Sequence, residues 1–100
     1  GALVDVVGCL MKGSDHAWVL THATEPIRTK KPSDSTAEEL KAWEAKPFGT
    51  RTFGLMDAAS YRPEPQAGRK VEVKGLIVKS PGNDRINITA LQMTASTCGF

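Results

Sequence analysis

The two cysteines, Cys9 and Cys98, carry the most specific side-chain chemistry in this chain. They lie near opposite ends of the 100-residue sequence, in the stretches VVGCLMKG and QMTASTCGF. A disulfide between them, the favoured interpretation, would close a loop of roughly 90 residues and stabilise the domain by about 4–5 kcal/mol in the chain-entropy model. Two buried free thiols are the alternative, because cysteine is among the most buried residue types. A metal or reactive role has less support, since the chain has no C-x-x-C motif.

Histidine and methionine side chains could extend such a site toward copper, which Cys, His and Met ligands suit. The candidates are His16, His22, Met11 and Met93. However, His16 falls in an expected turn, and His22 falls near the end of an expected strand. We therefore expect surface or strand-edge histidines, with no metal site and no cofactor.

Catalytic motifs are missing from the sequence. It contains no H-E-x-x-H, G-x-S-x-G, P-loop or G-x-G-x-x-G pattern. Its acidic residues fall mostly in expected turns, in an expected helix or on an expected solvent-exposed strand face. We therefore predict a protein that is not an enzyme.

Composition indicates one soluble domain that spans residues 1–100. Hydrophobic residues make up 40% of the chain and charged residues 24%, which is typical of a folded protein. The net charge of +2, from 13 basic and 11 acidic residues, is too balanced to indicate a polyanionic partner. No apolar run approaches the length that spans a membrane.

Alternation of apolar and polar residues predicts five strands. Their expected ranges are 4–12, 17–23, 52–57, 70–79 and 85–95. The fourth is the clearest, with apolar residues on one face and charged residues on the other: Val71, Val73 and Ile77 against Lys70, Glu72 and Lys74. This pattern predicts one buried and one solvent-exposed face. In the fifth strand the apolar positions slip by one residue from Ala90 to Leu91 and Met93, which predicts a β-bulge.

Residues 25–51 interrupt the strand pattern and are expected to form an insertion with one short helix. Ser35 is the expected N-cap of this helix, and Glu38, three residues later, would complete a capping box. Leu40 and Trp43 share one face of the helix. They would either plug one end of the molecule or form an exposed patch for a protein partner.

Mid-strand glycines in the first and fourth strands, Gly8 and Gly75, supply the bends that a small barrel needs. We therefore predict an all-β fold with one short inserted helix, arranged as a five-stranded OB-like Greek-key barrel.

Several phrases of the sequence resemble a group of small exported bacterial OB-like domains of unassigned function. They are VVGCLMKGSDHAWVLTHA, TFGLMDAA, AGRKVEVKGLIV and INITALQMTASTC. In that group a V-x-G-C-L opening strand, a G-x-x-V-x-V-x-G strand and a final Cys recur. The resemblance covers nearly the whole chain outside the insertion. It implies export and a Cys–Cys bond, and it implies no activity.

OB-folds can bind single-stranded nucleic acid with aromatic side chains and a basic groove. The candidates for base stacking are Trp18, Phe53 and Tyr61, and those for phosphate contacts are Arg28, Lys30, Lys31, Arg69, Lys70 and Lys74. Aromatic residues, however, make up only 6% of the chain, and basic residues alternate with acidic ones. We therefore favour a non-catalytic binding or interaction module for an unknown protein or small ligand. A single-stranded nucleic-acid binder is the alternative.

The first residues bear on localisation. The chain begins Gly-Ala-Leu without an initiator Met, and we expect Gly1 to remain from cleavage of a tag. Any signal peptide or lipidation site upstream would then have been removed. Together with the cysteine pair, this favours a periplasmic or secreted protein.

Overall fold

The computed structural model describes residues 1–100 and is mostly β. The strands are β1 (Leu3–Lys12), β2 (Trp18–Ala23), β3 (Ile27–Arg28), β4 (Arg51–Met56), β5 (Arg69–Val78) and β6 (Arg85–Thr97). One α-helix, α1 (Ala37–Ala45), and two 3₁₀-helices, η1 (Ala58–Tyr61) and η2 (Glu64–Gln66), complete the fold. The chain thus has six strands rather than five, because residues 27 and 28 pair with β1.

None of the helices has the length or the apolar character that crossing a bilayer requires.

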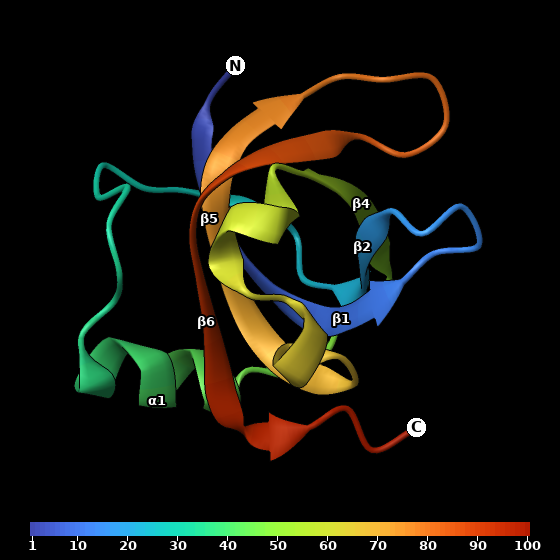
Figure 1. Cartoon of the computed structure of the whole chain (residues 1–100). Coiled ribbons are helices and arrows are strands. Elements are labelled where there is room, and N and C mark those ends of the chain that lie inside the picture. The colour runs from blue at the N-terminus through green and yellow to red at the C-terminus, as the bar shows by residue number, and fades with distance from the viewer.

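The six strands form one sheet whose pairings close on themselves. Its order is β2-β4-β6-β5-β1-β3, and β2 also pairs with β1. Five long strands therefore follow one another in a cycle, β1–β2–β4–β6–β5–β1, while the short β3 lies outside it on β1. The β4–β6 pairing is parallel and the others are antiparallel. Figure 1 shows these strands curving around a common centre.

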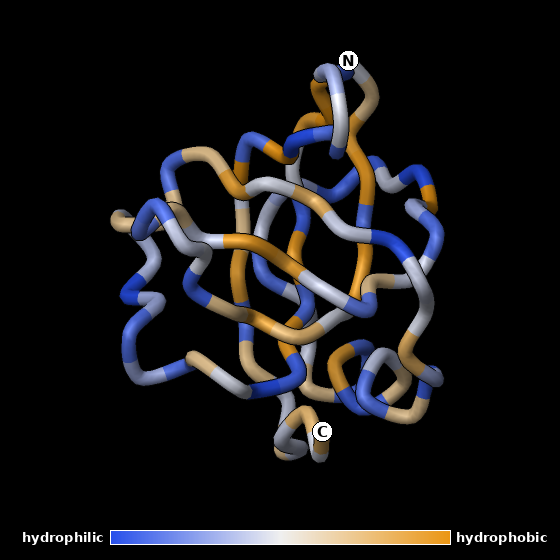
Figure 2. Tube along the Cα trace, turned by 90° about the vertical axis from the view of Figure 1, so that its right-hand side faces the viewer, coloured by the Kyte–Doolittle hydropathy of each residue, from blue (hydrophilic) through white to orange (hydrophobic).

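Apolar side chains fill the space that the strands enclose. The residues with no measurable exposure include Val6, Leu10, Leu20, Phe53, Val71, Val73 and Ile86. They come from every long strand of the cycle, so the alternation of the sequence places one face of each strand in a shared core. In Figure 2 several of the apolar stretches of the trace, in orange, run through the middle of the molecule.

The connector between β4 and β5 closes this core on one side. Ala58 of η1 is buried in the apolar cluster, and Tyr61 packs against that cluster. The Tyr61 hydroxyl also donates a hydrogen bond to the Ile88 carbonyl oxygen at 3.1 Å. Figure 1 shows the connector, in yellow-green, crossing in front of the enclosed space.

Two glycines allow neighbouring strands to approach closely. A Cβ atom at Gly75 would lie 2.2 Å from the Asn87 carbonyl oxygen and 2.6 Å from the Ile86 Cγ2 atom. At Gly8 a Cβ atom would lie 2.8 Å from the Leu20 Cγ atom. Both glycines therefore meet the predicted need for close strand packing inside a small closed sheet.

The predicted β-bulge in the last strand is confirmed, slightly earlier than expected. Lys74 is opposite Ala90, but the next residue, Gly75, is opposite Ile88, so β6 contains one extra residue just before Ala90. The expected apolar position of Met93 is wrong, since this side chain is 47% exposed. Met93 lies where the β5–β6 register shifts a second time.

The inserted helix begins one residue later than predicted. Thr36, not Ser35, is its N-cap, and its capping-box partner is Glu39 rather than Glu38. The Thr36 hydroxyl accepts from the Glu39 backbone N–H at 3.2 Å, and a Glu39 carboxylate oxygen accepts from the Thr36 N–H at 2.8 Å. The Ser35 hydroxyl instead donates to the Glu72 carboxylate at 3.0 Å.

The charged face of β5 is buried, which overturns the expected solvent-exposed face. Lys70, Glu72 and Lys74 are only 6%, 1% and 2% exposed. Parts of the segment between β2 and β4, residues 24–50, lie over this face. We call this segment the insertion from here on. The Lys74 ammonium group, for example, donates to the Ser33 carbonyl oxygen at 2.8 Å. Figure 1 shows the insertion, in teal and green, beside β5 and β6.

We predict that Gly75→Ala will strongly destabilise the fold, because the added methyl group meets a backbone carbonyl that cannot move without breaking the β5–β6 pairing. Overpacking of this kind costs about 1–3 kcal/mol or more of unfolding free energy. Equilibrium unfolding in urea would measure the loss.

Gly54→Ala is the matched control for this substitution. Its methyl group would lie 3.2 Å from the Arg85 Cγ atom, which belongs to a flexible side chain. We expect a loss below about 1 kcal/mol for this variant. Equal losses in the two variants would contradict the proposed role of the close strand approach at Gly75.

Candidate functional site

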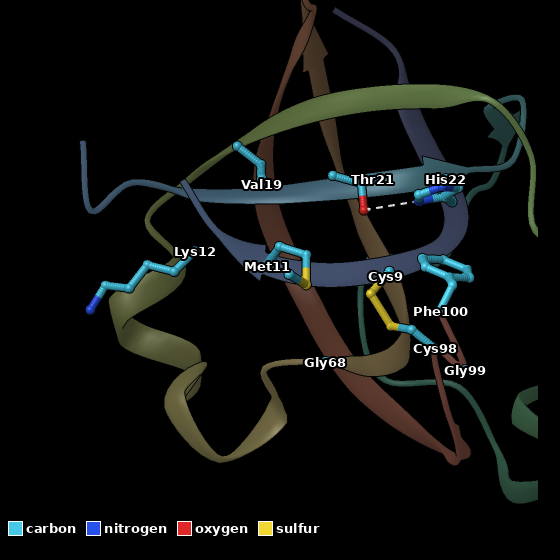
Figure 3. A pocket seen from close by; sticks show the side chains of 10 residues that line it. All are labelled: Cys9, Met11, Lys12, Val19, Thr21, His22, Gly68, Cys98, Gly99 and Phe100. Carbon is cyan, nitrogen blue, oxygen red and sulfur yellow. Dashed lines mark hydrogen bonds between the residues drawn. A yellow bond between two sulfur atoms is a disulfide. The ribbon is translucent and has the colours of Figure 1, made fainter. Parts of the chain in front are cut away.

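A cavity of about 440 Å³ opens between β1, β2 and the last residues of the chain. We call it the disulfide pocket, and Figure 3 shows its lining: Cys9, Met11, Lys12, Val19, Thr21, His22, Gly68, Cys98, Gly99 and Phe100. The floor of the pocket consists of side chains that alternate onto the outer face of two paired strands, β1 and β2. Cys9 is opposite Thr21 and Met11 is opposite Val19, so these four side chains share the outer face of the sheet.

The predicted disulfide is confirmed and forms part of this floor. Cys9 on β1 is bonded to Cys98, with a Cα–Cα distance of 5.6 Å, and no free cysteine remains. The Cys98 backbone N–H also donates to the Gly68 carbonyl oxygen at 2.9 Å. These two links hold the end of the chain against β1, so the two-thiol and metal-ligand interpretations of these cysteines are wrong for this structure.

Two aromatic rings, His22 and Phe100, line one side of the pocket, and the Phe48 ring packs behind them. The Phe100 ring centroid lies 4.0 Å from that of His22 and 5.1 Å from that of Phe48, a residue of the insertion. On the far side of Phe48, the Lys70 ammonium nitrogen lies 4.6 Å from the ring centroid. This side of the pocket is therefore built by β2 and the last residues of the chain, and the insertion supports it from behind through Phe48.

His22 adopts an unusual backbone conformation at this wall. Its φ of 51° falls in the left-handed region, which non-glycine residues rarely occupy. The β2–β4 register shifts between Leu20 and Ala23, around this residue. One consequence is an exposed imidazole whose Nδ1 atom lies 3.2 Å from the Thr21 hydroxyl oxygen. Strained backbone of this kind often accompanies binding sites.

The lining of the pocket combines apolar surface with a few polar atoms. Methionine, valine, phenylalanine and the disulfide supply apolar surface, while Thr21 and His22 supply polar atoms. Lys12 points away from the cavity in Figure 3, and its ammonium nitrogen lies 5.5 Å from the Trp18 ring centroid. The volume falls within the usual range of small-molecule sites, about 300–1,000 Å³.

A second group of functional side chains lies beneath the insertion. We call it the charged layer, and it consists of Asp5 on β1 with Lys70, Glu72 and Lys74 on β5. The Lys70 ammonium group donates to the Glu44 carbonyl oxygen at 2.8 Å and to the Lys46 carbonyl oxygen. Burial lowers the pKa of Lys70, and the Glu44 carboxylate opposes that shift. The lysines of the layer thus act as hydrogen-bond donors to backbone carbonyl oxygens of the insertion.

Asp5 has the most perturbed ionisation in the protein. Burial, then a hydrogen bond to the Glu72 carboxyl group and its negative charge, raise the pKa of Asp5 from 3.8 to about 8, although Lys74 opposes the shift. One carboxyl oxygen of each acid, Asp5 Oδ1 and Glu72 Oε1, is buried without a conventional hydrogen-bond donor. Unpaired buried oxygens are rare in folded proteins, so this pair calls for a physical explanation.

The residues predicted to bind a ligand do not form one surface. Trp18 and Phe53 belong to the core, with 9% and 0% exposure. Tyr61 packs at the connector, and an Arg69 guanidinium N–H donates to the Thr94 carbonyl oxygen at 3.0 Å. The other two candidates, Lys70 and Lys74, lie in the charged layer. Their role in ligand binding stays a prediction.

The proposed partner patch lies on the outside of the sheet. Helix α1 packs on β5 and β6, and no residue of the helix is fully buried. Leu40 and Trp43 are therefore half-buried, and the Lys46 ammonium nitrogen lies 4.7 Å from the Trp43 ring centroid. The connector near Ala58 closes one side of the core, so the helix does not plug the molecule on that side. Binding of a partner at this patch stays a prediction.

Sequence reasoning overlooked most of the disulfide pocket. Val19 and Thr21 were assigned to a strand, but the neighbouring β1 side chains and the chain end were not placed over them. Along two paired strands, residues that point outward alternate with residues that point into the core. This alternation, together with a Cys–Cys bond at the end of the strands, would have indicated the site. Phe48 and Phe100 lie outside any periodic pattern, so only the three-dimensional structure reveals their contact.

No family model matches this chain, and no curated protein or solved structure matches it either. Its function must therefore be argued from its own residues and geometry.

We predict that replacing both cysteines by alanine, Cys9→Ala with Cys98→Ala, will lower the unfolding free energy by about 4–5 kcal/mol, because the bond spans 89 residues. Urea unfolding of the oxidised protein and the double variant would measure the difference. Wild-type protein kept in a reductant is the control and should resemble the double variant. A difference below about 1 kcal/mol would contradict a stabilising role.

Proposed function

We propose that this protein is an exported, non-catalytic binding module that takes a small, largely apolar ligand in the disulfide pocket. The observation that carries the proposal is the cavity itself, whose floor is fixed by the bond between Cys9 and Cys98. A pocket with a fixed floor loses little conformational entropy when a ligand enters, and this favours affinity.

We also propose that the closed sheet is an OB-like Greek-key barrel. The first long strand pairs with the second and the fourth, and the third pairs in parallel with the fifth, β4 with β6. This pairing order supports a five-stranded barrel of that type, with β3 as an addition on its outside.

Export to a periplasmic or extracellular space is supported by the disulfide. Such bonds persist in oxidising compartments and are rare where thiols are kept reduced. The bond also reaches almost to the end of the described chain, so its loss would free one wall of the pocket.

A binding role, rather than catalysis, is supported by the groups that line the cavity. Its sulfur atoms are already bonded to each other, and His22 contacts the Thr21 hydroxyl rather than a carboxylate that would orient it as a base. Apolar walls with a few polar atoms are the usual composition of a ligand pocket.

Single-stranded nucleic acid is the alternative ligand, and it has weaker structural support. The proposed stacking residues Trp18 and Phe53 are buried, and the ammonium groups of Lys70 and Lys74 already donate to backbone carbonyl oxygens. A gel shift with single-stranded DNA at low and high salt tests this alternative, since phosphate binding weakens steeply with salt.

We predict that the amphiphilic dye anilinonaphthalene sulfonate will bind in the disulfide pocket. Fluorescence titration should show saturable binding, and amide NMR shifts should change around Met11, Val19, Thr21 and Gly99. Val19→Asp places a charge on the apolar floor and should weaken binding by at least about tenfold.

Val78→Asp is the matched control, because Val78 is an exposed valine on β5 outside the pocket lining. It should bind the dye as wild type does, and circular dichroism would confirm that both variants are folded. Unchanged binding by Val19→Asp, or shift changes confined to another surface, would refute the assignment of the pocket.

A further inference from the structure

We propose that Asp5 and Glu72 share one proton, and that this proton acts as a pH-sensitive latch holding the insertion against β1 and β5. The two acids lie on neighbouring strands and on the same outer face of the sheet. Asp5 is opposite Lys74 in the β1–β5 register, so Glu72 is its diagonal neighbour. Their exposures are only 7% and 1%.

The unpaired oxygens are the first observation that supports a shared proton. Asp5 Oδ1 and Glu72 Oε1 are both buried and lack a donor. Two ionised carboxylates cannot hydrogen-bond to each other, because both are acceptors only. One added proton turns either group into a donor and satisfies both oxygens at once.

Charge balance in the layer is the second observation. Lys74 is the cation opposite Asp5, while the ammonium group of Lys70 lies farther along β5 and donates to the backbone of residues 44 and 46. With one shared proton, the acid pair carries a single negative charge that Lys74 balances. Without it, two buried negative charges face one buried positive charge, an arrangement that burial makes costly.

The same groups anchor the insertion to the sheet. The Ser35 hydroxyl donates to Glu72 Oε2 at 3.0 Å, and the Lys74 ammonium group donates to the Ser33 carbonyl oxygen at 2.8 Å. Gln92 of β6 also binds the Ser35 backbone, because its side-chain amide oxygen accepts from the Ser35 N–H at 2.7 Å. A change of charge on the acid pair therefore acts directly on the residues that attach the insertion.

The surroundings of Asp5 on every packed element agree with this assignment. On β5, Asp5 faces Glu72 and Lys74. From the insertion, the negative charge of the Glu39 carboxylate, which is itself paired with Lys31, also acts on Asp5. The only nearby β3 charge, Arg28, is exposed. The groups that favour the protonated acid outweigh Lys74, and the pKa of Asp5 rises to about 8.

The sign of the pH effect follows from this shift. An unfolded chain loses the Asp5 proton near pH 3.8, whereas the folded chain keeps it up to about pH 8. The folded state thus binds more protons between these values, so its stability falls as the pH rises across that interval and levels off above it. The shared proton is mostly present at neutral pH and is lost in mildly alkaline solution.

Loss of the proton should open the insertion before it unfolds the sheet. Helix α1 has no fully buried residue, whereas the core is closed by strand pairing and by the Cys9–Cys98 bond. Local opening takes place in the part of a protein with the fewest buried contacts.

Two measurements on the oxidised protein test the latch without any ligand, so their result is independent of the proposed function. Carbon-13 NMR of the side-chain carboxyl groups should show Asp5 titrating near pH 8. Hydrogen exchange, corrected for intrinsic base catalysis, should show that amides of residues 33–46 lose about tenfold or more of their protection between about pH 6 and pH 9.

Asp5→Asn supplies a permanent donor and should abolish this pH-dependent loss of protection. Asp34→Asn, the same change at an exposed site of the insertion, should retain it. The latch is refuted if Asp5 titrates near pH 4, or if Asp5→Asn and Asp34→Asn lose protection equally. Should Asp5→Asn fail to fold, the titration of the wild-type carboxyl groups still decides the question.

Discussion

Residues 70–75 of strand β5 are buried on both faces, and most features outside the core depend on this constraint. Its inner face contributes Val71 and Val73 to the apolar cluster, and its outer face carries the lysines and the glutamate of the charged layer. A sheet that closes on itself would normally leave its outer face to water. Here the insertion covers that face, so each charged group needs a partner within the protein.

The charged layer and the disulfide pocket are joined by a chain of side-chain contacts through Phe48. Lys70 donates to the backbone at residues 44 and 46, and its ammonium nitrogen lies 4.6 Å from the Phe48 ring centroid. Phe48 in turn contacts Phe100, whose ring lies tilted against that of His22 in the pocket. A movement of the insertion would therefore reach a ring that lines the pocket.

The core elements could be predicted from the sequence because they depend on local periodicity. All five long strands were expected within two residues of their observed ends, and the mid-strand glycine Gly75 and the bulge before Ala90 were recognisable for the same reason. The alternation along β5 indicated correctly which residues share a face. This alternation could not indicate what lies over the charged face. A polar strand face shows the same sequence pattern whether water or an irregular segment covers it.

The candidate site was less predictable because its parts meet only through non-local contacts. The Cys9–Cys98 bond followed from composition and spacing, but its position beside Met11 and Val19 depends on strand pairing. The charged layer also depends on contacts between β5 and a segment 26 to 41 residues earlier in the chain. Sequence patterns of any single element carry no information about such contacts.

The use of lysine in a buried layer has a specific physical reason. The insertion is largely irregular, so its carbonyl oxygens lack the partners that a sheet or a long helix provides. Helix α1 has no basic residue in its own last turn, and Lys70 from β5 donates to carbonyl oxygens at its C-terminal end instead. Lys74 likewise donates to the carbonyl oxygen of Ser33, which lies before the helix. Apolar residues at these two positions would bury well, but they would leave those carbonyl oxygens without donors.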